Sequence, residues 1–231
     1  MALYDRDYNN STMDTNYTTV TDSASVTFMK QTYQLLGASM IASALGAYVA
    51  MPYVEIISSF KWFIFGFVMF MAFFGFSITR KNHTLHLMAL FVFTFALGVM
   101  IVPLLAFTIA KGNGAFIGNA FLMTSVLFGA LSLFAINSKS DFSSWGKPLF
   151  ITFVVIFIAS LVNYFFLHSP MMHIVITAGI LLLFSLFTIY DTQNIANGAY
   201  DTPVDAAVSL FLDFFNMFTA ILQLLGIMGD D

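Results

Sequence analysis

Two aspartates, Asp191 and Asp213, interrupt stretches that are otherwise apolar enough to cross a membrane. They lie in Leu-Phe-Thr-Ile-Tyr-Asp-Thr-Gln (186–193) and Ser-Leu-Phe-Leu-Asp-Phe-Phe-Asn (209–216). A carboxylate inside a membrane span is costly, so its default interpretation is functional, with a partner nearby. Two carboxylates in contact at low dielectric do not both ionise cheaply, and they can share a proton or bind a cation. The residue types therefore predict a proton-sensing or ion-binding pair.

Other polar side chains recur on the helix face that carries Asp213. At spacings of four, three, four and three residues, this stripe consists of Ser209, Asp213, Asn216, Ala220 and Gln223. Such spacings place the residues on one side of a helix, which should not face lipid. A weaker stripe joins Thr188 to Asp191 in the preceding segment. Hydrogen bonds between helices would explain Thr188, Ser209 and Asn216 as well as a supporting role at the aspartate pair would.

Arg80 and Lys81 follow the second apolar stretch. Either residue can act as the basic group that reaches the membrane interface. Because Lys81 can do this, Arg80 is free to turn inward. A guanidinium can bind a carboxylate through two parallel hydrogen bonds, which an ammonium group cannot do.

The composition is that of a membrane protein. The chain has 231 residues, of which 59% are hydrophobic and 9% are charged, and its mean hydropathy is +0.88. Soluble domains carry roughly 25% charged residues. A net charge of −4 without a basic tract argues against a nucleic-acid partner. The absence of cysteine excludes disulfides, thiolate catalysis and cysteine metal sites.

Apolar runs separated by polar, glycine-containing or proline-containing breaks predict an all-α membrane protein with seven transmembrane helices. The predicted spans cover residues 31–50, 61–79, 85–110, 115–136, 149–167, 171–193 and 205–228. Residues 1–27 are polar and lack the layout of a cleaved signal peptide. We therefore expect a flexible tail over 1–27 and one transmembrane domain over 28–231.

The basic residues predict the orientation of these spans. Seven crossings would place six basic residues on one side, namely Arg6, Lys30, Arg80, Lys81, Lys139 and Lys147. Only Lys61 and Lys111 would lie on the other side, so we expect a cytoplasmic N-terminus and an external C-terminus, unless the last run is re-entrant. Asp213 would then lie roughly 12 Å into its span, in the same cytoplasmic half as Arg80 and Asp191.

Several segments resemble the Bax inhibitor family, the transmembrane proteins with the Bax-inhibitor motif, in its bacterial branch. The most specific are Tyr190-Asp191-Thr192-Gln193 and Leu210-Phe211-Leu212-Asp213-Phe214-Phe215-Asn216. The likeness covers most of the chain after about residue 28, and it includes Leu97-Gly98, Pro103-Leu104, Lys139 to Ser143, and Ala159 to Asn163.

This resemblance implies a fold, a location and an activity. The last of the seven helices would be enclosed by the other six, in the bacterial cytoplasmic (inner) membrane. The activity would be a pH-sensitive calcium leak, with calcium ions and protons as partners and no cofactor. Asp191 and Asp213 would form the family's di-aspartyl pH sensor, and Arg80 would be the latch that engages one of them. The acidic end, Asp230-Asp231, differs from the basic tail of some eukaryotic members.

The expected mechanism follows from the charges. A shared proton would hold the last two helices together, and its loss would make the carboxylates repel each other or bind a cation. Calcium takes about six to eight oxygen ligands, of which two aspartates supply at most four. Water, backbone carbonyls, Asn216 or Thr188 would have to supply the rest. We therefore expect a weak calcium site at Asp191 and Asp213.

Other functions remain open, although we expect a protein that is not an enzyme. The chain could regulate another membrane protein by binding it, without transporting ions. An intramembrane aspartyl protease would also pair two aspartates, and Tyr190-Asp191 fits that pattern. However, Phe211-Leu212 precedes the second aspartate where Gly-x-Gly is expected, and no Pro-Ala-Leu follows.

An intramembrane zinc hydrolase is a further alternative that would need inward-facing histidines. The chain offers four, at His83, His86, His168 and His173. We expect all four to be solvated at the membrane interfaces.

Overall fold

The computed structural model describes residues 5–229, with their side chains from Ser25 onward. Every regular element in this part of the chain is a helix. Seven segments are long and apolar enough to cross a membrane, and they cover residues 25–59, 61–79, 83–110, 115–137, 143–167, 170–196 and 203–228. The all-α fold with seven spans is therefore confirmed.

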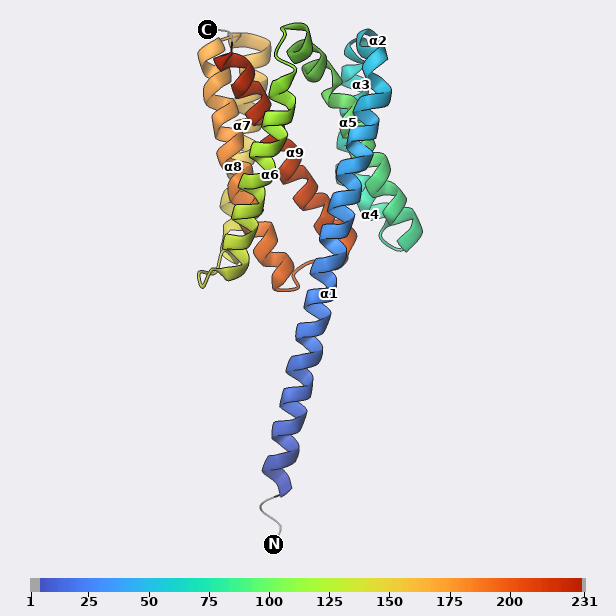
Figure 1. The fold of residues 1–231 in the computed structure, drawn as a ribbon, viewed down its shortest axis with the longest axis vertical. Helices are drawn as coiled ribbons and strands as arrows, with labels where there is room; N and C mark the ends of the chain where they lie inside the picture. The colour runs from blue at the N-terminus through green and yellow to red at the C-terminus, as the bar shows by residue number, and fades with distance from the viewer. Residues whose placement is uncertain (1–4, 230–231) are drawn as a thin grey trace.

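The first two spans are each built from several helical pieces. The long helix α1 (Asp5–Ala50) continues through a 3₁₀ turn (Met51–Tyr53) into α2 (Val54–Ser59). Its N-terminal part projects beyond the bundle (Figure 1). The second span joins α3 (Lys61–Phe70), a wide π-helical turn (Met71–Gly75) and α4 (Phe76–Thr79). The flexible tail expected over residues 1–27 falls almost wholly outside the described side chains and stays a prediction.

The remaining spans are longer continuous helices. They are α5 (His83–Ala110), α6 (Ala115–Asn137), α7 (Gly146–Val162), α8 (Pro170–Ala196) and α9 (Pro203–Met228). A 3₁₀ turn (Ser143–Trp145) precedes α7, and a π-helical turn (Asn163–Leu167) follows it. The fifth span therefore begins six residues before the predicted start at 149. Pro148 lies in the first turn of α7, where its missing N–H leaves no helical hydrogen bond unmade.

Helix α9 packs against α1, α5, α6 and α8. Its inward side includes Leu210, Met217 and Leu222, all with no exposed surface. In Figure 1, α9 runs obliquely between the group α6–α8 and the group α1–α5. Enclosure of this helix by all six other spans is not confirmed, since α7 packs mainly on α8.

Two glycines allow α1 and α5 to approach closely. A Cβ atom added to Gly98 on α5 would overlap the carbonyl oxygen of Ser43 on α1. A Cβ added to Gly46 on α1 would overlap the carbonyl oxygen of Phe95 on α5. Small residues permit such contacts between membrane helices. Gly46 of the first span and Gly98 of α5 thus serve helix packing.

The loop over residues 197–202 joins α8 to α9 and shapes the site described below. Gly198 ends α8 with a positive φ of 71°, and its N–H donates to the carbonyl oxygen of Ile195. Thr202 caps α9, because its hydroxyl oxygen accepts a hydrogen bond from the Asp205 N–H at 3.1 Å. This loop and the turn after α4 lie at the same end of the bundle (Figure 1).

Candidate functional site

Residues 190–193 lie in the last turns of α8 and fix that helix end to its surroundings. Gln193 accepts a hydrogen bond from the Phe142 N–H (2.6 Å) and donates one to the Ser140 carbonyl (2.8 Å). The Thr192 hydroxyl donates to Ser132 on α6 at 3.3 Å. These neighbours of Asp191 therefore hold its helix against α6 and the α6–α7 loop.

The structure brings Asp191 and Asp213 together across the α8–α9 contact. Their side chains lie within hydrogen-bonding distance of each other. Both are buried, with 6% and 3% of their surfaces exposed. A hydrogen bond between two carboxyl groups requires a proton on one of them. The Oδ2 atom of Asp213 is buried and receives no hydrogen bond from a donor among the described residues.

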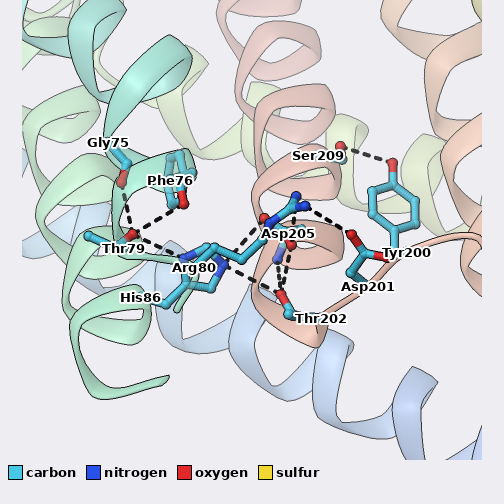
Figure 2. A network of polar contacts seen from close by, with 10 residues as sticks. All are labelled: Gly75, Phe76, Thr79, Arg80, His86, Tyr200, Asp201, Thr202, Asp205 and Ser209. Atoms are coloured by element: carbon cyan, nitrogen blue, oxygen red, sulfur yellow. Dashed lines mark hydrogen bonds and ion pairs between the residues drawn. The ribbon is translucent and has the colours of Figure 1, made fainter. Parts of the chain in front are cut away.

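Tyr200, in the α8–α9 loop, links this pair to the rest of α9. Its hydroxyl donates to Oδ1 of Asp191 at 2.9 Å. The same hydroxyl lies 3.0 Å from the hydroxyl of Ser209, as Figure 2 shows. Burial raises the pKa of the Tyr200 phenol above its ordinary value, and the negative charge of Asp191 raises it further. The phenol therefore remains protonated and acts as a donor to Asp191.

Arg80 forms its ion pairs with carboxylates other than the two buried ones. Its Nη1 lies 2.9 Å from Oδ2 of Asp201, and its Nη2 lies 3.2 Å from Oδ2 of Asp205 (Figure 2). The sequence led us to expect Asp191 or Asp213 as the partner. Arg80 lies level with the 197–202 loop and the first turn of α9, so it meets the carboxylates there. A latch role for Arg80 at the buried pair stays a prediction.

His86 is buried in the same cluster, contrary to the interfacial position expected for all four histidines. Only 1% of it is exposed, and its Nε2 lies 3.3 Å from Oδ1 of Asp205. Its Nδ1 lies 3.1 Å from the hydroxyl of Thr79, which itself donates to the Gly75 carbonyl at 2.8 Å. A ring nitrogen facing a carboxylate oxygen must carry a proton. His86 thus adds a donor to Asp205 beside Arg80 and the Thr202 hydroxyl, and connects α5 to the start of α9.

Two predicted supporting residues lie away from the pair's hydrogen bonds. The Thr188 hydroxyl donates to the Phe184 carbonyl and lies 3.5 Å from the sulfur of Met217. The Asn216 side chain donates to the Leu212 carbonyl. Of the supporting residues, Ser209 alone joins the network, since its side chain hydrogen-bonds Asp191 as well as Tyr200.

Comparison with known proteins decides the family. A family model described as "Inhibitor of apoptosis-promoting Bax1" matches residues 25–230. The chain belongs to the Bax inhibitor family. A Helicobacter pylori relative is 41% identical over 230 residues, covering 100% of this chain and 99% of that protein. A Campylobacter jejuni relative is 42% identical, with 97% of each chain covered. A Vibrio cholerae membrane protein is 33% identical, covering 88% of this chain and 90% of its own.

In this Bax inhibitor family member, two of the four carboxylates in the network could be identified as site residues from the sequence, and the other two could not. Asp191 and Asp213 stand out because they interrupt apolar helices. Asp201 and Asp205 lie at a helix start, where acidic residues are common. Tyr200 sits in a loop, where an aromatic hydroxyl gives no signal.

Proposed function

We propose that this protein is a pH-sensitive calcium leak channel or transporter, not an enzyme, gated by Asp191 and Asp213. The observation that carries the proposal is the contact between these two buried carboxyl groups, each on a different membrane-spanning helix. Membership of the Bax inhibitor family supports it. The protein would act in the bacterial cytoplasmic membrane.

The gating step is the gain or loss of the proton that the two carboxyl groups share. With the proton in place, a hydrogen bond joins α8 to α9. When the proton leaves, two negative charges face each other in a low-dielectric site, and their repulsion favours separation of the helices. Calcium flux should therefore rise as the pH rises through the range in which the proton is lost.

Calcium would pass this pair as cargo, in a weak oxygen-rich site. The carboxylates of Asp191 and Asp213 supply hard oxygen ligands, and no donor among the described residues occupies Oδ2 of Asp213. The neighbouring protein oxygens belong to Tyr200 and Ser209. Thr188 and Asn216, which are bonded to their own helices, contribute no ligand in this arrangement. The remaining ligands would be water, and weak binding suits an ion that must leave again.

The test is calcium flux into liposomes that contain the purified protein, measured across a range of pH. We expect the wild-type flux to rise between about pH 6 and pH 8, because a buried carboxyl pair gives up its shared proton well above the range of a solvated aspartate. The variants Asp191→Asn and Asp213→Asn remove one ionisable group each and should shift or flatten this profile.

Asp141→Asn is the matched control. Hydrogen bonds from Ser143 lower the pKa of Asp141 below its ordinary value, so this exposed loop carboxylate stays ionised throughout the tested range. Its replacement should leave the profile unchanged. The proposal fails if both variants at the pair keep the wild-type profile, or if flux falls as the pH rises.

Two alternative functions, a regulator of another membrane protein and an intramembrane aspartyl protease, predict other results. A protein that acts only by binding another membrane protein would pass no calcium at any pH. An intramembrane aspartyl protease would cleave a membrane substrate and lose that cleavage in Asp191→Asn.

A further inference from the structure

A cavity of about 420 Å³ opens between the second span and the start of α9. Polar residues from both walls and from the 197–202 loop line it, including Ser77, Arg80, Tyr200, Asp201, Asp205 and Ser209. A water molecule occupies about 30 Å³ in the liquid. The cavity is therefore large and polar enough to hold several waters.

The two ends of this cavity differ in exposure. At the outer end, the side chains of Arg80 and Asp201 are 51% and 73% exposed, and they form an ion pair. At the inner end lie Tyr200 and Ser209, which Figure 2 shows in contact. The hydroxyls of both residues hydrogen-bond Asp191. The cavity thus reaches from exposed charged groups to within one hydrogen bond of a buried carboxyl.

We propose that this cavity is the water-filled route by which protons and small cations reach Asp191 from the end of the bundle that carries the 197–202 loop. Tyr200 and Ser209 form its inner end, and the ion pairs of Arg80 with Asp201 and Asp205 cross its mouth. Acidic groups at the mouth favour cations over anions. The inference rests on the proposed function, because it supplies the access that a buried proton sensor needs.

The chain has no cysteine, so single-cysteine variants can report water access at one position each. We would place the full-length protein in lipid nanodiscs, where both membrane faces are open. A cationic methanethiosulfonate reagent would then be added to Ser77→Cys at the mouth and to Ser209→Cys at the inner end. Val208→Cys, which also lines the cavity, serves as a second inner position if Ser209→Cys does not fold.

The matched control is Ser185→Cys, a partly buried position on α8 whose native hydroxyl bonds the Leu181 carbonyl. We expect Ser77→Cys and Ser209→Cys to react, and Ser185→Cys to react at least about tenfold more slowly, because a charged reagent needs a hydrated thiolate. If Ser77→Cys reacts while both inner positions react as slowly as Ser185→Cys, the route does not exist.

The variant Arg80→Ala tests whether the ion pairs of Arg80 restrict entry at the mouth of the cavity. Adding Arg80→Ala to Ser209→Cys should accelerate modification several-fold, since the side chain that bridges the two carboxylates is gone. An unchanged rate would overturn the place assigned to these ion pairs. Labelling is measured without calcium, so a labelled protein that carries no flux would refute the proposed function and leave the route standing.

Discussion

At the scale of single residues, the hydroxyl of Tyr200 connects the buried carboxyl pair to its polar surroundings. It donates to Asp191 and contacts Ser209. A donor of this kind stabilises the ionised form of the carboxyl group that it contacts. Tyr200 should therefore help to set the pH at which the shared proton leaves.

Tyr200→Phe keeps the ring and removes this donor. The carboxyl pair should then hold its proton to a higher pH, because the ionised form has lost a hydrogen bond. A hydrogen bond to a charged group contributes about 1.5 kcal/mol, which corresponds to a shift of about one pH unit. We expect the midpoint of the calcium-flux profile in liposomes to rise by about that amount.

Tyr190→Phe is the control for this prediction. The Tyr190 hydroxyl lies against Gly146, where an added Cβ would come within 2.5 Å of it. The midpoint should be unchanged in this variant. A midpoint that moves equally in both variants would show that the Tyr200 contact does not tune the pair.

The residues that sequence reasoning could predict are those whose type conflicts with their segment. Asp191 and Asp213 conflict with apolar helices, and their depth follows from residue counts. The partners of Arg80 do not follow in this way, because several carboxylates lie within a few residues of its depth. Which of them it meets depends on how the helices are arranged in the membrane plane. The burial of His86, likewise, depends on its contact with Asp205 from another span.

At the scale of elements, the contact between α1 and α5 depends on the absence of side chains at two glycines. The obstacle beside Gly98 is backbone, namely the carbonyl group of Ser43. Backbone in a packed helix cannot move aside without moving the helix. The closeness of these two helices is thus encoded at Gly46 and Gly98.

Gly98→Ala tests this contact. Alanine is the better helix former by about 1 kcal/mol, but overpacking costs about 1–3 kcal/mol and should dominate here. We expect a lower thermal unfolding midpoint for the detergent-solubilised protein. In the control Gly66→Ala, nothing lies within 4 Å of the added Cβ, so stability should be equal or slightly higher. Equal midpoints for the two variants would contradict a close α1–α5 contact.

The elements themselves could be predicted well because length and hydropathy decide them in a membrane. Errors arise where proline was taken as a break, as at Pro148. Proline is tolerated in the first turn of a helix, and α5 continues through Pro103, so a proline does not by itself mark the end of a membrane helix. The wide turn at 71–75 has no proline to announce it, and hydropathy does not distinguish a π-helical turn from an α-helical one.

At the scale of the whole molecule, the seven spans place the α6–α7 loop and the α5–α6 loop at opposite ends of the bundle (Figure 1). The first loop carries Lys139 and lies at the same end as Arg80. By the positive-inside rule, we expect this end to face the cytoplasm. The positions of the spans could be predicted from the sequence, but the four neighbours of α9 could not, because hydropathy carries no information about lateral order.

Single cysteines in these loops test the orientation. Ser140→Cys lies in the α6–α7 loop, and Asn113→Cys lies in the α5–α6 loop. In spheroplasts, a membrane-impermeant maleimide should label Asn113→Cys directly and Ser140→Cys only after permeabilisation. The opposite pattern would invert the orientation, and labelling of both positions in intact spheroplasts would contradict the crossing of the membrane by α6, which separates the two loops.

Helix α9 presents Asp205, Ser209 and Asp213 at intervals of four residues. Arg80 and His86 contact Asp205, Tyr200 contacts Ser209, and Asp191 contacts both Ser209 and Asp213. Turning α9 about its long axis would displace all three side chains in the same sense. The attachments would then fail together instead of one by one. If α9 turns as a unit, loss of the one shared proton would release all of these contacts at once, and the response to pH should be no steeper than a one-proton titration.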